Sequence, residues 1–149
     1  MSSLKQLIDR RRIKRTYHTI DREQVSKILE EHLPEHRAFL LYGKYTIPKL
    51  DPLKAALSSS IVEEAKAQAD EYDCDNFALH MHSVMTMEYE CNACGLVISL
   101  ESDNVFNIFV ARDNGIYQVY EYKPHKGTVA QVKKTELPDY VIKGQTILF

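Results

Sequence analysis

The residue in this chain most able to do chemistry is Cys74, which lies in the segment Tyr-Asp-Cys-Asp-Asn-Phe-Ala over residues 72–78. The apolar residues that follow it recur at three- and four-residue spacing: Phe77, Met81, Val84 and Met85. This spacing predicts a helix from about Asp73, with Cys74 in its first turn. The free N–H groups and the dipole at a helix start stabilise a thiolate, whereas the carboxylates of Asp73 and Asp75 oppose it.

Two interpretations of Cys74 follow from its position. A thiol activated in this way is the nucleophile that a thiol protease or a transglutaminase needs, provided that a neighbouring sheet supplies a histidine and a residue to orient it. The alternative is that Cys74 is a small buried apolar side chain and that the segment is only a capped helix start.

The same segment resembles a known family. Tyr-Asp-Cys-Asp-Asn-Phe-Ala, followed by a strand led by Gly95 and by a strand with aromatic residues and Asn, is similar to papain-like and transglutaminase-like cysteine proteases. The similarity is to the protease-like domain of a fungal agglutinin and to related bacterial and phage proteins, and it covers roughly residues 45–127. It implies a papain-like fold with Cys74 as the nucleophile.

The resemblance also shows where this chain departs from the family pattern. The histidine that leads the family's second strand is replaced by Asn104, which follows Asp103. The family's Glu before Pro is replaced by Lys123, although Glu121 lies two residues earlier. Because an amide cannot accept a proton from a thiol, Asn104 predicts a scaffold without its catalytic base. A working enzyme would need His125 as base, with Glu121 or Asp103 to orient it.

A second cysteine motif, Cys91-Asn-Ala-Cys94-Gly95, is typical of a zinc knuckle, in which two thiolates converge on one ion. His82 is a candidate further ligand, and only one of His80 and His82 could serve because residues two apart on a helix point in different directions. The alternative is a pair of half-buried thiols. A redox pair is disfavoured because no strand-then-helix context surrounds the motif.

Composition limits the function classes. Nineteen basic and twenty-one acidic residues among 149 give a net charge of −2, which argues against a globally basic nucleic-acid binder. The basic cluster over residues 10–15 predicts either a phosphate or acidic-partner contact or a solvated helix face. Three cysteines do not suit a disulfide scaffold. No apolar run is long enough to cross a bilayer and no secretory signal is visible, so we expect a cytoplasmic protein without a membrane contact.

The pattern of elements predicts an α+β fold. The first third reads as helical, with an N-cap at Asp21 and Gln24 three residues later. Residues 43–52, with two prolines and a glycine, predict a loop or short extended piece, and residues 59–72 predict a helix. After about Gly95 the period changes to two, and Asp113-Asn-Gly115 predicts a hairpin turn. The expected strands cover residues 96–100, 105–111, 116–122, 129–132 and 141–148.

We therefore expect one domain over residues 1–149, with a helical preface over 1–40 and a papain-like core over 41–149. An antiparallel sheet of four to five strands should pack on the Cys74 helix. The expected function is binding of a protein or peptide by a degenerate papain-like protein, which in a phage or bacterial setting would inhibit a partner. The alternatives are a cysteine hydrolase or acyl-transferase that uses Cys74, and a small interaction module stabilised by zinc.

Overall fold

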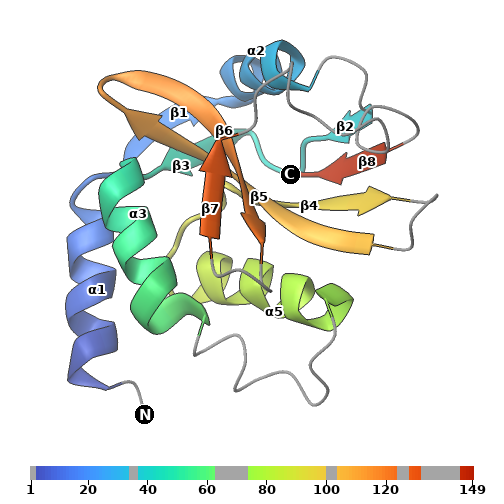
Figure 1. Ribbon diagram of the computed structural model, residues 1–149. Helices are drawn as coiled ribbons and strands as arrows, with labels where there is room; N and C mark the ends of the chain where they lie inside the picture. The colour runs from blue at the N-terminus through green and yellow to red at the C-terminus, as the bar shows by residue number, and fades with distance from the viewer. Residues whose placement is uncertain (1–2, 34–36, 63–73, 100–103, 124–127, 132–144) are drawn as a thin grey trace.

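The computed structural model describes residues 3–33, 37–62, 74–99, 104–123, 128–131 and 145–149. Figure 1 shows a central sheet with helices on both of its faces. The helices are α1 (Leu4–Lys14), α2 (Arg22–His32), α3 (Leu50–Ala56), a π-helical turn η1 (Leu57–Ile61) and α5 (Cys74–Met87). Among the described residues, no helix is long and apolar enough to cross a bilayer.

The main sheet has six strands in the order β2-β8-β4-β5-β6-β7. Its strands are β2 (Arg37–Phe39), β4 (Cys94–Ser99), β5 (Asn104–Asp113), β6 (Ile116–Lys123), β7 (Thr128–Gln131) and β8 (Gln145–Leu148). All neighbours pair antiparallel except β2 with β8, which pair parallel. A small second sheet joins β1 (His18–Asp21) to β3 (Lys44–Ile47). The expected α+β class is confirmed.

Helix α5 packs against β4 and β5, and α2 lies on the opposite face against β6 (Figure 1). The α5 residues expected to share one face, Phe77, Met81, Val84 and Met85, are all buried, which confirms the spacing argument. The Phe77 ring stacks on Tyr122 of β6 with centroids 6.0 Å apart. Apolar burial on this scale is the main force that holds a helix on a sheet.

Local signals in the sequence also form the structure that they predict. The Asp21 side chain accepts from the Gln24 backbone N–H at 2.9 Å, and the Gln24 side chain caps the Asp21 N–H in return. At the β5–β6 hairpin, Asn114 and Gly115 adopt positive φ values of 50° and 78°, which this turn requires.

Two expectations from the sequence differ from the structure. Helix α3 begins at Leu50, inside the segment expected to be a loop, because Pro52 lies in its first turn, where a missing N–H removes no helical hydrogen bond. The sequence predicts a helix over residues 59–72. Its described part, residues 59–62, is formed by η1 and the one helical residue that follows it, and residues 63–73 lie outside the described residues.

The strand count also differs from the four to five expected, because the first forty residues contribute strand β2. All three residues of β2 are exposed, so no alternation of apolar and polar residues marks it in the sequence. Those forty residues also share the main core, with Ile13, Ile20 and Val25 in the same cluster as Phe109 of β5. The division into preface and core stays a prediction.

Candidate functional site

Helix α5 begins at Cys74, as the sequence predicts. The backbone of Cys74 is described, and its side chain and Asp73 lie outside the described part. The first residue of a helix has a backbone N–H without a partner inside the helix, as do the next three residues. A helix start at this position, as the sequence predicts, would favour a thiolate.

A buried amide attaches this end of the helix to the sheet. Asn107 of β5, 1% exposed, donates from Nδ2 to the Ala78 carbonyl of α5 over 2.9 Å. Its Oδ1 is buried and has no hydrogen-bond partner among the described residues. An amide in this position costs desolvation that an apolar residue would not. The signal that could have identified Asn107 is one polar residue inside the run Val-Phe-Asn-Ile-Phe-Val over residues 105–110.

A second hydrogen bond fixes the direction of α5 over the sheet. His82 donates from Nδ1 to the Cys94 carbonyl over 2.6 Å, and Cys94 pairs with Phe109 of β5. Residue 78 of the helix thus lies beside residue 107 of β5, and residue 82 lies beside Cys94, the partner of residue 109. Both numbers rise together, so α5 runs in the same direction as β5. Four helical residues and two strand residues each span roughly 6 Å. The backbone of Cys74 is thus level with residue 105, near the start of β5.

This alignment brings several of the predicted positions to one end of the sheet. Asn104 is the first residue of β5, and Lys123 is the last residue of β6, which pairs antiparallel with β5. Glu121 pairs with Ile108, is half-buried and lies on the face opposite to Tyr122, the residue whose ring stacks on Phe77 of α5. Figure 1 shows α5 beginning at the end of the sheet where β4 ends and β5 begins. The side chains of Asn104 and Lys123 are not described, and Asp103 and His125 lie outside the described residues.

The described histidines lie away from this end. His80 and His82 are on α5 itself, which is continuous from Cys74 to Met87, so they are about 9 and 12 Å along the helix axis from Cys74. His82 is also engaged with the Cys94 carbonyl. His32 contacts the Ile28 carbonyl through Nδ1 on α2, and His18 is exposed on β1.

The Cys91–Cys94 motif follows α5 in the chain, and its Cys94 returns beside the middle of the helix, near His82 and Asn107. Both thiols are fully buried and free, and the Cys91 thiol contacts the Thr46 carbonyl at 3.4 Å. Burial raises the pKa of Cys91 to about 12, and burial together with the nearby Cys91 raises the pKa of Cys94 well above its ordinary value. Both shifts favour the protonated thiol over the thiolate that zinc binds.

No group of three or more His, Cys, Asp and Glu side chains in the described part of the chain is placed to hold a metal. The zinc site at Cys91, Cys94 and His82 therefore stays a prediction. Two cavities lie elsewhere, beside α3. One, of about 300 Å³, is lined in part by Lys49 and Arg112, and one of about 350 Å³ is lined in part by Arg12 and Arg15.

Comparisons with known proteins show the fold. No family model matches the sequence, and no curated protein is significantly similar to it. Nine solved chains match the structure. One of them is the PSL1a–E64 complex, with a TM-score of 0.61 and 20% sequence identity over 88% of this chain and 51% of the other. The chain thus spans about half the length of that protein, and the likeness supports a protease-like fold.

Proposed function

We propose that this chain is a papain-like protein without a catalytic base from β5, and that it binds a protein or peptide beside the first turn of α5. The observation that carries the proposal is the alignment of α5 with β5, in which Cys74 is level with the beginning of the strand. In a cysteine protease this is the place from which a histidine reaches the thiol. Here the strand begins with Asn104, and its residues on the face that packs on α5, Val105 and Asn107, include no base.

The chemistry of Asn104 favours occupancy without cleavage. A neutral amide donates and accepts hydrogen bonds, so it can hold a peptide group, but it cannot take the thiol proton. Lys123 at the end of β6 adds a cation that would attract a carboxylate of the bound segment. The match to the PSL1a–E64 complex supports the scaffold on which the proposal rests, and the name of that complex pairs its protein with a bound molecule.

The rival function is a working cysteine hydrolase or acyl-transferase in which His125 replaces the missing base and Glu121 or Asp103 orients it. Alkylation of Cys74 by iodoacetamide between pH 5 and 9 separates the two. Without a base, the Cys74 rate follows a single thiol titration and His125→Ala leaves it unchanged. With a thiolate–imidazolium pair, labelling is fast at pH 6 and His125→Ala removes the fast phase.

A peptide library of degenerate sequence, incubated with the chain, tests occupancy directly. We expect peptides to be retained and eluted intact, and Cys74→Trp to abolish retention because a bulky ring would block the space beside the first turn of α5. Leu79→Trp is the matched control, since Leu79 lies one turn further along α5 and is 55% exposed. Cleaved peptides that disappear with Cys74→Ala would contradict the proposal, and so would retention that Cys74→Trp does not affect.

The variant Asn104→His tests whether the strand position is the one that a base would occupy. If a histidine at the start of β5 reaches the thiol, the variant gains rapid alkylation of Cys74 at pH 6 that the natural chain lacks. Ser99→His is the control, because Ser99 pairs with Asn104 across the β4–β5 ladder but belongs to another strand. An equal gain in both variants would contradict the assignment.

A further inference from the structure

Helix α1 presents a stripe of residues to solvent that the proposed function does not use. Leu4, Leu7, Ile8, Arg11 and Arg15 recur at the three- and four-residue spacing that puts them on one face. Leu4 is 73% exposed, Leu7 47% and Ile8 41%, and both arginines are exposed. We call these five residues the α1 stripe.

The other side of α1 explains how the helix is held. Ile13 is its buried residue and lies on the face opposite Leu4. Arg10 pairs with Glu88 at 3.1 Å and lies over the Tyr89 ring, and Lys14 pairs with Glu90 at 3.2 Å. The inward cations therefore attach α1 to the turn after α5, and the outward apolar turn is not needed for that attachment.

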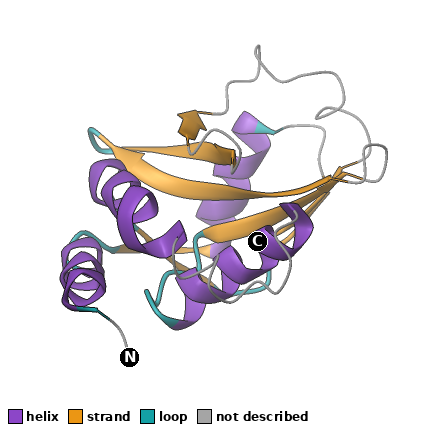
Figure 2. Cartoon of the chain, turned by 60° about the horizontal axis from the view of Figure 1, so that its bottom comes forward, coloured by secondary structure: helices purple, strands orange, loops and turns teal. Residues whose placement is uncertain are grey.

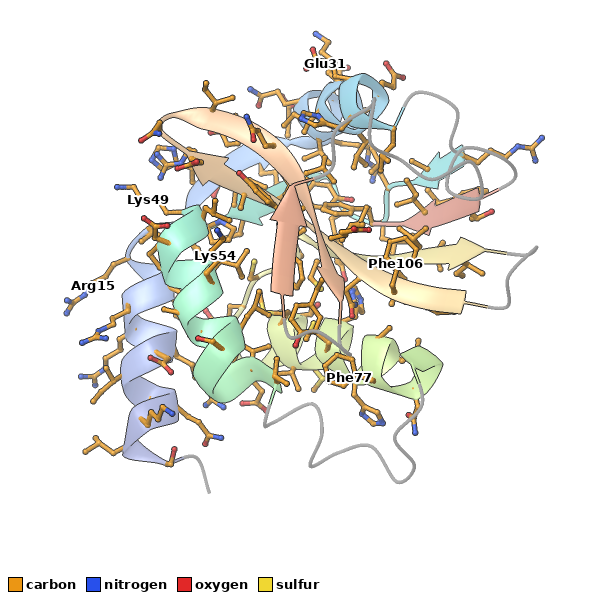
Figure 3. All side chains as sticks on the ribbon, in the orientation of Figure 1. Arg15, Glu31, Lys49, Lys54, Phe77 and Phe106 are labelled. Carbon is orange, nitrogen blue, oxygen red and sulfur yellow. The ribbon has the colours of Figure 1, made fainter. Side chains whose placement is uncertain are left out.

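The charge of the α1 stripe points to an anionic partner. It contains two cations and no acid, and Lys5 and Arg12 are exposed beside it. The nearby acids Asp9 and Asp51 line the hollow between α1 and α3 together with Arg12 and Arg15. The exposed glutamates of α2, including Glu31, lie on a different side of the molecule from Arg15 (Figure 3).

We propose that the α1 stripe is a contact surface for an anionic lipid bilayer. Both views show α1 at the rim of the molecule, as a ridge that a flat surface can meet along its length (Figures 1 and 2). Its five residues extend over about 16 Å. Leu4, Leu7 and Ile8 would enter the acyl boundary, and the guanidinium groups would contact lipid phosphates bidentately. This is a contact on the bilayer surface, made by one exposed helix.

Co-sedimentation with vesicles tests the proposal. The full chain should bind vesicles of phosphatidylcholine and phosphatidylserine in equal parts and should not bind phosphatidylcholine alone. Arg11→Glu with Arg15→Glu should lower the partition coefficient at least about tenfold, since each cation near the surface contributes to binding. Leu4→Ser with Ile8→Ser should lower it too, because the inserted apolar area is lost.

The controls distinguish a loss of vesicle contact at α1 from a loss of folding and from a general change in surface charge. The substituted residues are exposed, so each variant should stay folded, with the arginine variant melting a few degrees lower because its glutamates oppose the dipole at the end of α1. Lys27→Glu removes an exposed cation from α2 and Leu79→Ser removes an exposed leucine from α5, and both should leave vesicle binding unchanged. Absence of binding to the anionic vesicles at low salt would overturn the proposal. The proposal would also be overturned if the chain bound duplex DNA or an acidic polypeptide, but not vesicles, and if the arginine variant abolished that binding.

Discussion

The cysteine that begins α5 differs in its place in the fold from the two cysteines that follow the helix. Cys74 is the first described residue of α5, at the end of the sheet where β5 begins. Cys91 and Cys94 follow the last turn, inside the core with Tyr89 and Ala93, and all four are 0% exposed. The Cys91 thiol contacts a carbonyl oxygen, and Cys94 lies 3.8 Å from the Asn107 amide.

The comparison shows that position, more than motif, decides what a thiol can do. In the sequence, both Cys74 and the Cys-x-x-Cys pair are candidate chemical sites. In the fold, the pair lies where desolvation holds both sulfurs protonated, whereas the thiolate expected at the single cysteine stays a prediction. The helix thus stands between a position where a thiolate is predicted and a pair of thiols that burial keeps protonated.

The largest expected effect is a difference in alkylation rate between Cys74 and the buried pair. The pKa of Cys91, about 12 against an ordinary 9, lowers its thiolate fraction at pH 8 about thousandfold. We expect iodoacetamide at pH 8 to label Cys74 at least that much faster than Cys91 or Cys94, measured for each cysteine by peptide mass spectrometry. In urea all three should react at similar rates. Equal rates in the folded protein would remove the distinction.

The same burial predicts a loss of stability in alkali. The folded pKa of Cys91 lies above its unfolded value, so its stabilising contribution is complete below about pH 9 and is lost as the pH rises toward 12. In that window the free energy of unfolding should fall by about 1.4 kcal/mol per pH unit for each buried thiol. Urea unfolding from pH 8 to 10.5 measures the slope. Cys91→Ala should make it shallower, and an unchanged slope would contradict the assignment.

A substitution next to Cys94 tests how tightly the core around this residue is packed. A Cβ added at Gly95 would overlap the Phe149 ring and lie 2.8 Å from the Leu148 carbonyl. Because Phe149 is fully buried and the carbonyl belongs to β8, Gly95→Ala should lower the free energy of unfolding by about 1–3 kcal/mol. Gly43→Ala is the matched control, since nothing lies within 4 Å of its added Cβ. Equal free energies of unfolding for the two variants would show that β8 and Phe149 shift to accommodate the added methyl group.

The parts of the fold that the sequence predicts are those set by local chemistry. The buried face of α5, the Asp21 capping box and the Asn114–Gly115 turn each depend on residues a few positions apart, so their patterns can be read directly. Strand β2 could not be predicted, because Arg37 pairs with Thr146 across more than a hundred residues and no residue of β2 is buried.

The candidate site divides in the same way. The helix start at Cys74 is a local feature and was predicted. The contact of Asn107 with Ala78 depends on how a helix and a strand far apart in sequence align, and the dryness of Cys91 depends on residues such as Tyr17 and Thr46 from the first third of the chain. The two-residue spacing between Cys91 and Cys94 predicts neither the alignment of α5 with β5 nor the burial of the two thiols.

The smallest expected effect comes from substituting Asn107. Its amide donates to the Ala78 carbonyl of α5 and lies 3.8 Å from the Cys94 thiol. Asn107→Leu removes the unpaired Oδ1 along with the Nδ2 bond, so the free energy of unfolding should stay level or rise by about 1 kcal/mol in urea titrations. Asn107→Asp is the control and should lower the free energy of unfolding, because it buries a carboxylate beside the Ala78 carbonyl.

If the amide holds the start of α5 in place, Asn107→Leu should also slow alkylation of Cys74 by roughly twofold to fivefold, which is the size of a helix-dipole contribution. Cys91 should stay unlabelled. A large loss of stability in Asn107→Leu would instead show that the bond itself outweighs the desolvation of the amide.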